Sequence, residues 1–337
     1  MIPATHRVLL LTQFGGPDAF RVVEQPVPEP GSGEVLVKVL AASVQFTDVI
    51  LRKGQYPDLE EKAPLILGYD FVGEVVKLGP GVTSPALGTR VADLTMTGSY
   101  AQFRLVEAAR CTVVDPAVDA GEATSLILSW MTAYQLLHRD ARVQASQKLL
   151  VLGASGAVGL ALIVLGKIAG CEVWGAAREK HHDRVRSLGA TPVDAEGADW
   201  AKVLPERFDA VFDGIAEGGF SRAWKAVGAR GHLSAYGFSK AVQDQTPFLM
   251  IGFMFLKLWW WNLVGGKRST SFYSITKLRK AHPDWFVEDL SVLLGLLSAG
   301  KIRPIVAERI PLEGVADAHA RIEKGGLDGK IVLVPNG

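Results

Sequence analysis

The stretch KLLVLGASGAVGLALIVLGKIAG, residues 148–170, restricts the fold more than any other part of the chain. An apolar strand pattern leads into Gly153, Gly156 and Gly159 at three-residue spacing, and an apolar helix pattern follows. In such a unit the first glycine permits a tight turn, the second lets the backbone approach a pyrophosphate, and the third lets helix and strand pack closely. The helix N-terminus then offers free N–H groups to phosphate. The spacing is GxxGxxG, a variant of the usual GxGxxG. The prediction of a dinucleotide site therefore rests on the strand pattern before the glycines and the helix pattern after them. The alternative is a tight strand–helix turn in another kind of α/β protein.

The segments around this loop predict two kinds of architecture. Buried strand patterns (EVWGAA, FDAVFDG, GHLSAYG) alternate with helical patterns after residue 147, which predicts a doubly wound parallel sheet. Residues 1–125 are instead rich in strand patterns separated by Gly-Pro turns, such as EVLVKVLAASV and FVGEVVKLGPGV. These predict a curled antiparallel sheet or partial barrel. A helix, WFVEDLSVLLGLLSAG, and a final strand, GKIVLVP, end the chain.

The end of the second strand of the predicted parallel sheet indicates which dinucleotide binds. NAD sites usually place an acidic residue there for the ribose 2′-hydroxyl, whereas NADP sites have a basic residue nearby. Here Ala176 and Ala177 end the strand, and Arg178, Lys180 and His181 follow. Small residues leave room for a 2′-phosphate that the basic cluster could pair with, so we expect NADPH. The alternative is that REKHHDR is only the solvated start of a helix.

Charge and cysteine content exclude several classes of protein. The formal net charge of +1 gives no electrostatic reason to expect nucleic-acid binding. Two cysteines in 337 residues cannot form a disulfide framework or a four-cysteine zinc site. The N-terminus contains only a short apolar run, VLLL, so a cytoplasmic protein is the default expectation.

The motifs along the whole chain resemble the medium-chain dehydrogenase/reductase superfamily. The resemblance is to its zinc-free quinone oxidoreductase branch, the zeta-crystallin type, and the C-terminal third is similar to the subgroup of vesicle amine transport protein homologues. The segments that carry it are PEPGSGEVLVKVLAASVQFTDVILRKGQYP, PLILGYDFVGEVVKLGPGV, GSYAQFRLV, TAYQLLHRDARV, LGASGAVGLA and GHLSAYGFS. It implies a GroES-like domain at 1–126, completed by 276–337, and an inserted Rossmann domain at 127–275. It also implies a homodimer formed through the edge strand near STSFYSI.

The resemblance further implies that the protein holds no metal. Zinc-dependent relatives use a cysteine in the first motif and a histidine in the second. At the matching positions this chain has Gln45 and Tyr69, and the third ligand position falls near Leu128. Amide, phenol and alkyl groups do not form a stable zinc site at neutral pH. Alcohol dehydrogenation is therefore not expected.

Without a metal, the substrate must already be activated toward hydride. A quinone, or an alkene conjugated to a carbonyl, accepts hydride directly from a nicotinamide held at short distance. A hydrogen-bond donor near the substrate carbonyl would stabilise the developing charge. From the resemblance, the candidate catalytic residues are Gln45, Tyr56 and Tyr69, while Asp48 is expected to be structural.

The resemblance also supplies the expected cofactor contacts. They come from the glycine loop, the end of the second strand, the ends of later strands and the C-terminal strand. The residues are Thr132, Gly153, Gly156, Ala157, Val158, Gly159, Ala177, Arg178, Lys180, His181, Tyr236, Gly237, Phe272, Ser274 and Lys330.

The segment FLMIGFMFLKLWWWNLVGG, residues 248–266, is almost wholly apolar. A membrane span needs about 20 apolar residues, and Lys257 interrupts this shorter run in the middle of the nucleotide-binding domain, so no transmembrane segment is expected. The favoured interpretation is a large apolar substrate pocket lined by Phe253, Trp259, Trp260 and Phe272. The other is an amphipathic helix that touches lipid through Trp and Lys.

Two functions follow from these observations. The first is an NADPH-dependent, metal-free reductase of an apolar quinone or an α,β-unsaturated carbonyl. The second is an NADPH-binding interaction protein at a membrane, with weak or no catalysis. The sequence does not identify the substrate, because many chemistries share this fold.

Overall fold

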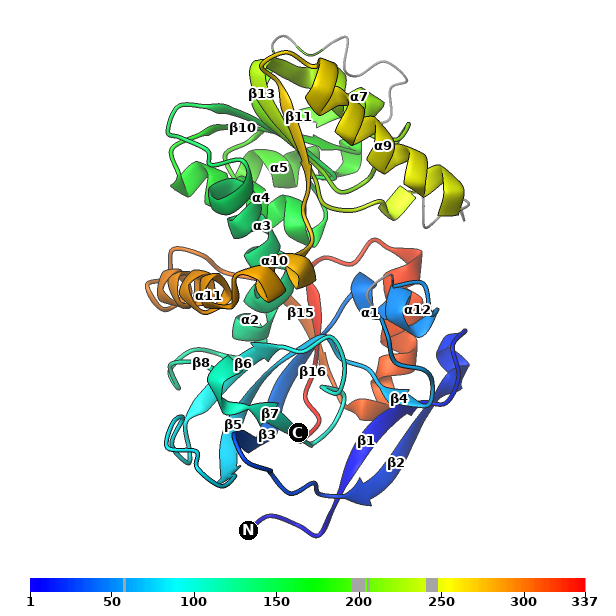
Figure 1. Cartoon of the computed structure of the whole chain (residues 1–337), viewed down its shortest axis with the longest axis vertical. Helices are drawn as coiled ribbons and strands as arrows, with labels where there is room; N and C mark the ends of the chain where they lie inside the picture. Colours follow the sequence, from blue (N-terminus) through cyan, green and yellow to red (C-terminus); the bar gives the residue numbers. More distant parts are fainter. Residues whose placement is uncertain (57–58, 196–203, 205–206, 241–247, 337) are drawn as a thin grey trace. The chain divides into compact units, whose positions relative to one another are not determined.

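The computed structural model describes residues 1–56, 59–195, 204, 207–240 and 248–336 (Figure 1). The chain forms two compact units. Unit 1 comprises Met1–Met131 with His282–Gly337, and unit 2 comprises Thr132–Ala281.

Unit 2 is built on a six-stranded sheet in which every neighbouring pair of strands is parallel. The strand order is β11-β10-β9-β12-β13-β14. The strands are β9 (Lys148–Leu152), β10 (Glu172–Ala177), β11 (Thr191–Asp194), β12 (Phe208–Asp213), β13 (Val227–Ala235) and β14 (Ser269–Phe272). The helices that follow β9 in this unit include α4 (Ala157–Ile168), α5 (His182–Ser187), α7 (Ser221–Ala226), α9 (Phe248–Val264) and α10 (Ile275–Ala281). The predicted doubly wound parallel sheet is confirmed.

The strand order of unit 2 creates a switch point. The chain moves outward from β9 through β10 to β11, and then returns to β12 on the other side of β9. In open parallel sheets, ligands bind outside the carboxyl ends of the strands at such a point. β14, from the stretch STSFYSI, lies at the edge of the sheet as the sequence predicted.

Unit 1 contains mainly antiparallel sheets, as expected from its strand patterns. One sheet has the order β2-β1-β4, and a larger one has the order β15-β16-β3-β5-β6-β8, with β7 also paired to β3. The strands are β1 (Thr5–Leu11), β2 (Phe20–Pro26), β3 (Glu34–Val44), β4 (Leu65–Ile66), β5 (Asp70–Leu78), β6 (Arg90–Leu94), β7 (Phe103–Glu107), β8 (Thr112–Val113), β15 (Val306–Ile310) and β16 (Lys330–Leu333). The principal helices are α1 (Phe46–Arg52), α2 (Ala120–Ser125), α11 (Pro283–Ser298) and α12 (Val315–Lys324).

The two ends of the chain meet in unit 1 because β16 pairs antiparallel with β3. Ile331 lies opposite Val44 in this register. Lys330 precedes Ile331 and Gln45 follows Val44, so the antiparallel register brings these two residues together although 285 residues separate them.

A helical run carries the chain from Ala120 to Asp140. It consists of α2, a π-helical stretch at Leu126–Trp130, α3 (Met131–Gln135) and a second π-helical stretch at Leu136–Asp140. Such stretches are rare and often occur near functional sites. This run supplies Ser129 to unit 1 and Thr132 to unit 2.

The apolar stretch at residues 248–266, which we call the tryptophan segment, forms a single helix, α9, drawn in yellow in Figure 1. It packs against β14 and contributes Leu258 to the core of unit 2. No helix in the described parts of the chain is both long and apolar enough to cross a membrane.

Candidate functional site

The glycine loop between β9 and α4 has the geometry of a phosphate cradle. Gly153 adopts a φ of +73°, a backbone conformation that residues with a side chain rarely adopt, so the position favours glycine. A Cβ on Gly159 would lie 2.2 Å from the Gly153 carbonyl oxygen, so helix and loop are packed too closely for any side chain there. Gly156 is the N-cap of α4, and Ala157 and Val158 form the first turn of that helix. The free N–H groups of this turn can receive a pyrophosphate.

The carboxyl end of β10 places the predicted basic cluster beside this loop. Ala177 is buried at the strand end, whereas Arg178 and Lys180 are exposed and His181 is half-buried. The His182 ring shares a 3.0 Å hydrogen bond with the Ala177 carbonyl oxygen, which fixes the turn after the strand. Because the strand ends in Ala177, no carboxylate stands at that position to accept a hydrogen bond from a ribose hydroxyl.

A small pocket opens next to the glycine loop at the switch point. Its lining comes from the carboxyl ends of β9, β10 and β12, the residues that follow β9, β11 and β12, and α7: Leu152, Gly153, Ala176, Ala195, Asp213, Ile215, Glu217 and Arg222. The buried Asp213 carboxylate accepts hydrogen bonds from the N–H groups of Ile215 and Ala216, at 2.8 and 3.0 Å. Burial nevertheless raises the pKa of Asp213 to about 6.

The remaining predicted cofactor residues of unit 2 lie on or after its strands and on α3. The Tyr236 ring covers Gly214, where a Cβ would lie 2.5 Å from the ring, and Gly237 approaches the backbone of the same residue. Phe272 stacks on Phe238 and meets the ring of Phe255 edge-on. Ser274 shares a 2.9 Å hydrogen bond with Thr276, and Thr132 is buried on α3. Their contact with a cofactor stays a prediction.

In unit 1, the β3–β16 pairing assembles a buried polar network around Gln45. The Gln45 amide donates to Asp70 at 2.7 Å and accepts from the Lys330 ammonium at 2.5 Å. Lys330 also donates to the Ser129 hydroxyl at 3.0 Å. Asp70 accepts from the Ser43 backbone N–H, and Asp48 accepts from the Gln45 backbone N–H. Lys330 is therefore held by the residue predicted to be catalytic.

Burial shifts the protonation equilibria of this network. Desolvation and, to a smaller extent, the neighbouring Asp70 charge together raise the pKa of Asp48 to about 8. Desolvation raises the pKa of Asp70 to about 6, opposed by the Lys330 ammonium and by hydrogen bonds from Ser43 and Gln45. Desolvation also lowers the pKa of Lys330, against the attraction of both carboxylates. The network thus contains a cation that burial disfavours and a carboxyl group, Asp48, that burial keeps protonated near neutral pH.

The two tyrosines predicted to be catalytic are hydrogen-bonded to each other. Their hydroxyl oxygens lie 2.7 Å apart, and their rings meet edge-on at a centroid distance of 5.9 Å. Tyr69 is fully buried, whereas Tyr56 is partly exposed. Tyr56 is the more accessible of the two phenols.

The residues at the expected zinc positions do not fit a zinc ion. Gln45 is engaged by Asp70 and Lys330, Tyr69 bonds to Tyr56, and Leu128 offers only an alkyl group. In the described residues, no three His, Cys, Asp or Glu side chains gather as a metal-binding group. An ammonium on Gln45 would also repel a divalent cation.

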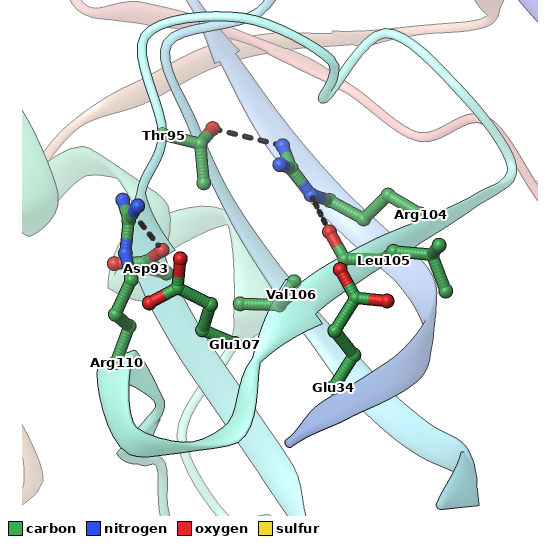
Figure 2. Close-up of a pocket in the computed structure, with 8 residues that line it drawn as sticks. All are labelled: Glu34, Asp93, Thr95, Arg104, Leu105, Val106, Glu107 and Arg110. Carbon is green, nitrogen blue, oxygen red and sulfur yellow. Dashed lines mark hydrogen bonds and ion pairs between the residues drawn. The ribbon is translucent and has the colours of Figure 1, made fainter. Parts of the chain in front are cut away.

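Figure 2 shows a different pocket, of about 150 Å³, on the large sheet of unit 1. It is lined by Glu34, Asp93, Thr95, Arg104, Leu105, Val106, Glu107 and Arg110. Arg110 pairs with Asp93 at 3.1 Å, and Arg104 donates to the hydroxyls of Thr95 and Ser99. None of the eight residues was predicted as a site residue, and the internal pairing of both arginines indicates a structural role.

Three of the four predicted substrate-pocket residues project from the exposed side of α9. Phe253, Trp259 and Trp260 are 52–61% exposed, whereas Phe272 is half-buried in the aromatic cluster on β14. None of these four residues lines the pocket beside the glycine loop. Their role in a substrate pocket remains a prediction.

The sequence did not reveal the residues that hold Gln45 in its buried polar network, which we call the Gln45 site. It did not single out Asp70 or Ser129, and it treated Lys330 only as a cofactor residue. One signal was present: Asp70 follows Tyr69 at the start of a strand pattern rich in apolar residues, and a carboxylate there must find donors when buried. The link from Lys330 to Gln45 required the pairing of strands from opposite ends of the chain.

Comparisons with known proteins agree with both units. Residues 31–116 match the alcohol dehydrogenase GroES-like domain, and residues 188–333 match a family described as zinc-binding dehydrogenase. The chain is 28% identical over 349 residues to the human synaptic vesicle membrane protein VAT-1 homolog, covering 98% of this chain and 86% of that protein.

Two solved structures extend these similarities to the fold. A mycobacterial protein, Rv1454c, complexed with NADPH is 26% identical, with a TM-score of 0.83 over 98% of this chain and 100% of that one. The quinone oxidoreductase from Coxiella burnetii is 24% identical, with a TM-score of 0.83 over 98% and 99% of the two chains. The chain is therefore an oxidoreductase of the medium-chain dehydrogenase/reductase superfamily, with a GroES-like and a Rossmann-type domain.

Proposed function

We propose that the protein is an NADPH-dependent reductase that transfers hydride, without a metal, to an apolar quinone or an α,β-unsaturated carbonyl. The observation that carries this proposal is the Gln45 site. The Gln45 amide, which is hydrogen-bonded to the Lys330 ammonium, occupies a position where zinc-dependent relatives have a zinc ligand. The substrate must therefore be electrophilic without the help of a Lewis acid. The complex of Rv1454c with NADPH and the similarity to a quinone oxidoreductase support the same reaction class.

The chain's own residues would bind the cofactor and the substrate carbonyl. When bound, NADPH supplies the hydride. The α4 N-terminus would hold its pyrophosphate, and Arg178 and Lys180 would hold the 2′-phosphate. Lys330 uses two of its three N–H donors on Gln45 and Ser129, which leaves one for a cofactor or substrate oxygen. Tyr56, supported by Tyr69, is proposed to donate to the substrate carbonyl.

Gln45 is proposed to act in a different way from the tyrosines. Its amide nitrogen and oxygen are both engaged, by Asp70 and Lys330. We therefore propose that Gln45 positions the Lys330 ammonium instead of contacting the substrate itself.

The reaction class is tested by following NADPH oxidation at 340 nm with phenanthrenequinone, naphthoquinones and alkenals. We expect turnover with at least one of them, in enzyme treated with a chelator as well as in untreated enzyme. Absence of turnover with the whole panel would contradict the proposal. Activity that disappears with the chelator and returns with zinc would contradict its metal-free part.

Cofactor preference gives a sharper prediction. Replacing Arg178 and Lys180 together with alanine should weaken NADPH binding by about 10- to 100-fold and leave NADH binding unchanged, because only NADPH carries the 2′-phosphate. The matched control is Arg230→Ala, which removes an exposed cation toward the amino end of β13, away from the carboxyl ends of the strands where the cofactor is proposed to bind. Fluorescence titration of both cofactors measures the effect. Equal losses for NADPH and NADH would show that these cations do not recognise the 2′-phosphate.

A second candidate function is a nucleotide-binding protein that acts at a membrane, with little catalysis. The name of the human relative, synaptic vesicle membrane protein VAT-1 homolog, and the exposed apolar side of α9 favour it. The substrate panel separates the two candidates, since this one is expected to bind NADPH without turnover. A homodimer formed through β14, which the resemblance implies, is a further proposal, and so is a cytoplasmic location.

A further inference from the structure

Lys330 carries a primary amine that the buried polar network of unit 1 holds in one position. Its nitrogen donates to the Gln45 amide oxygen at 2.5 Å and to the Ser129 hydroxyl at 3.0 Å. An ammonium has three N–H groups, so one of them is not used by these two acceptors. Lys330 as a whole is half-buried and therefore not enclosed by the chain. The amine is thus fixed in place and has a bonding direction left for a ligand.

The surroundings of Lys330 favour the neutral, nucleophilic form of its amine. Desolvation lowers the pKa of this ammonium, and the charges of Asp70 and Asp48 oppose the shift. Burial keeps the Asp48 carboxyl mainly protonated near neutral pH, because its pKa is raised to about 8, so Asp70 is the main counter-charge. A desolvated lysine of this kind is a typical covalent nucleophile. Lys277 and Lys301, by contrast, are exposed to water.

The polar network suits the product of a reaction between this amine and an aldehyde. An ammonium and an aldehyde give a protonated imine and water: the C–N bond forms, the C–O bond breaks, and two of the three ammonium protons leave with the oxygen. The positive charge remains on nitrogen, so Asp70 keeps its counter-ion. The N–H that remains can keep the bond to Gln45, which is the shorter of the two bonds that Lys330 donates.

We propose that Lys330 is a covalent site for α,β-unsaturated aldehydes, which it binds and activates as a protonated imine. This inference rests on the proposed function and names a substrate class within it. A cationic imine draws electrons from the conjugated alkene more strongly than a neutral carbonyl does, so it gives the activation that a Lewis acid would otherwise supply. Reduction by NADPH adds hydride to the β-carbon and a proton from water to the α-carbon. Hydrolysis of the imine then returns the lysine ammonium and the saturated aldehyde.

Borohydride trapping tests the covalent step without turnover. The intact chain, with and without NADP⁺, is incubated with trans-2-hexenal and sodium cyanoborohydride, digested, and mapped by mass spectrometry. We expect a secondary amine at Lys330 that has lost the aldehyde oxygen, formed at least about tenfold faster than at the exposed Lys277 and Lys301. A conjugate addition product retains that oxygen, so its mass distinguishes it. Finding only such a product at Lys330, or trapping there no faster than at Lys301, would overturn the inference.

The variant Lys330→Arg tests the activation, because arginine keeps the positive charge and the N–H donors but forms no such imine. We expect NADPH oxidation with hexenal to fall at least about 100-fold, and with phenanthrenequinone, which needs no imine, by less than about tenfold. The matched control is Lys301→Arg, the same exchange on an exposed lysine of unit 1, which should change neither rate. Thermal unfolding verifies that both variants fold.

The two assays separate this inference from the proposed function. Equal losses with the two substrates in folded Lys330→Arg would show that Lys330 acts only as a cation, and would overturn the inference. Unchanged turnover of hexenal would do the same. If Lys330 is trapped but the wild type reduces neither substrate, the proposed function fails and the covalent site stands. If the wild type reduces hexenal but Lys330 is not trapped, the proposed function stands and the covalent site fails.

Discussion

Replacing Gly159 with alanine is expected to abolish NADPH binding and to lower the free energy of unfolding by about 3 kcal/mol. The added Cβ would lie 2.2 Å from the Gly153 carbonyl oxygen and 2.8 Å from Ala154 Cα, both backbone atoms that cannot rotate away. The loop and the α4 N-terminus would have to separate. That movement would displace the N–H groups that are proposed to hold the pyrophosphate.

Gly156→Ala provides a control within the same loop. Gly156 has an ordinary φ of −79°, and its added Cβ would meet only the Gly153 carbonyl oxygen, at 3.3 Å. We expect this variant to lose little stability but to bind NADPH more weakly, since the methyl group would stand where the pyrophosphate approaches. Urea unfolding and fluorescence titration measure the two effects separately. If Gly159→Ala were as stable as the wild type, the close packing of loop and helix would be refuted.

Most of unit 2 could be predicted from its sequence because its elements are locally determined. The strand EVWGAA coincides with β10, and the loop glycines are where the tight turn and the close packing occur. Buried parallel strands appear as continuous apolar runs, and the glycines that separate strand from helix are required by backbone geometry. Neither signal depends on distant residues.

The Gln45 site could not be predicted to the same extent, because it depends on contacts distant in sequence. Lys330 and Gln45 meet only through the β3–β16 register, and Ser129 joins them from a π-helical stretch that has no clear sequence signal. The tryptophan segment shows a related limit. Its composition predicts burial or lipid contact, but which side of the helix faces the core is set by Asn262, Leu258 and their partners on β14 and α7.

Replacing Asp48 with asparagine is expected to make the protein less sensitive to rising pH. Asp48 is fully buried, and desolvation raises its pKa from 3.8 to about 8, so the folded protein keeps the carboxyl protonated at pH values where the unfolded chain ionises it. Between those two values the folded state binds more protons than the unfolded state. Its stability therefore falls as pH rises, at a slope of up to about 1.4 kcal/mol per pH unit. Asparagine resembles the neutral acid and can still accept from the Gln45 N–H.

The difference between the two proteins should be clearest from pH 6 to 8. Below that range Asp70 and Asp213, whose pKa values burial raises to about 6, contribute slopes of the same sign in both proteins. Urea unfolding at several pH values measures the slope, and Asp183→Asn, which removes an exposed carboxylate, is the control. A loss of stability in Asp48→Asn with an unchanged slope would mean that folded Asp48 is ionised at neutral pH. The Lys330 ammonium would then be balanced by two carboxylates, Asp48 and Asp70, and its remaining N–H donor would be less available to a cofactor or substrate oxygen.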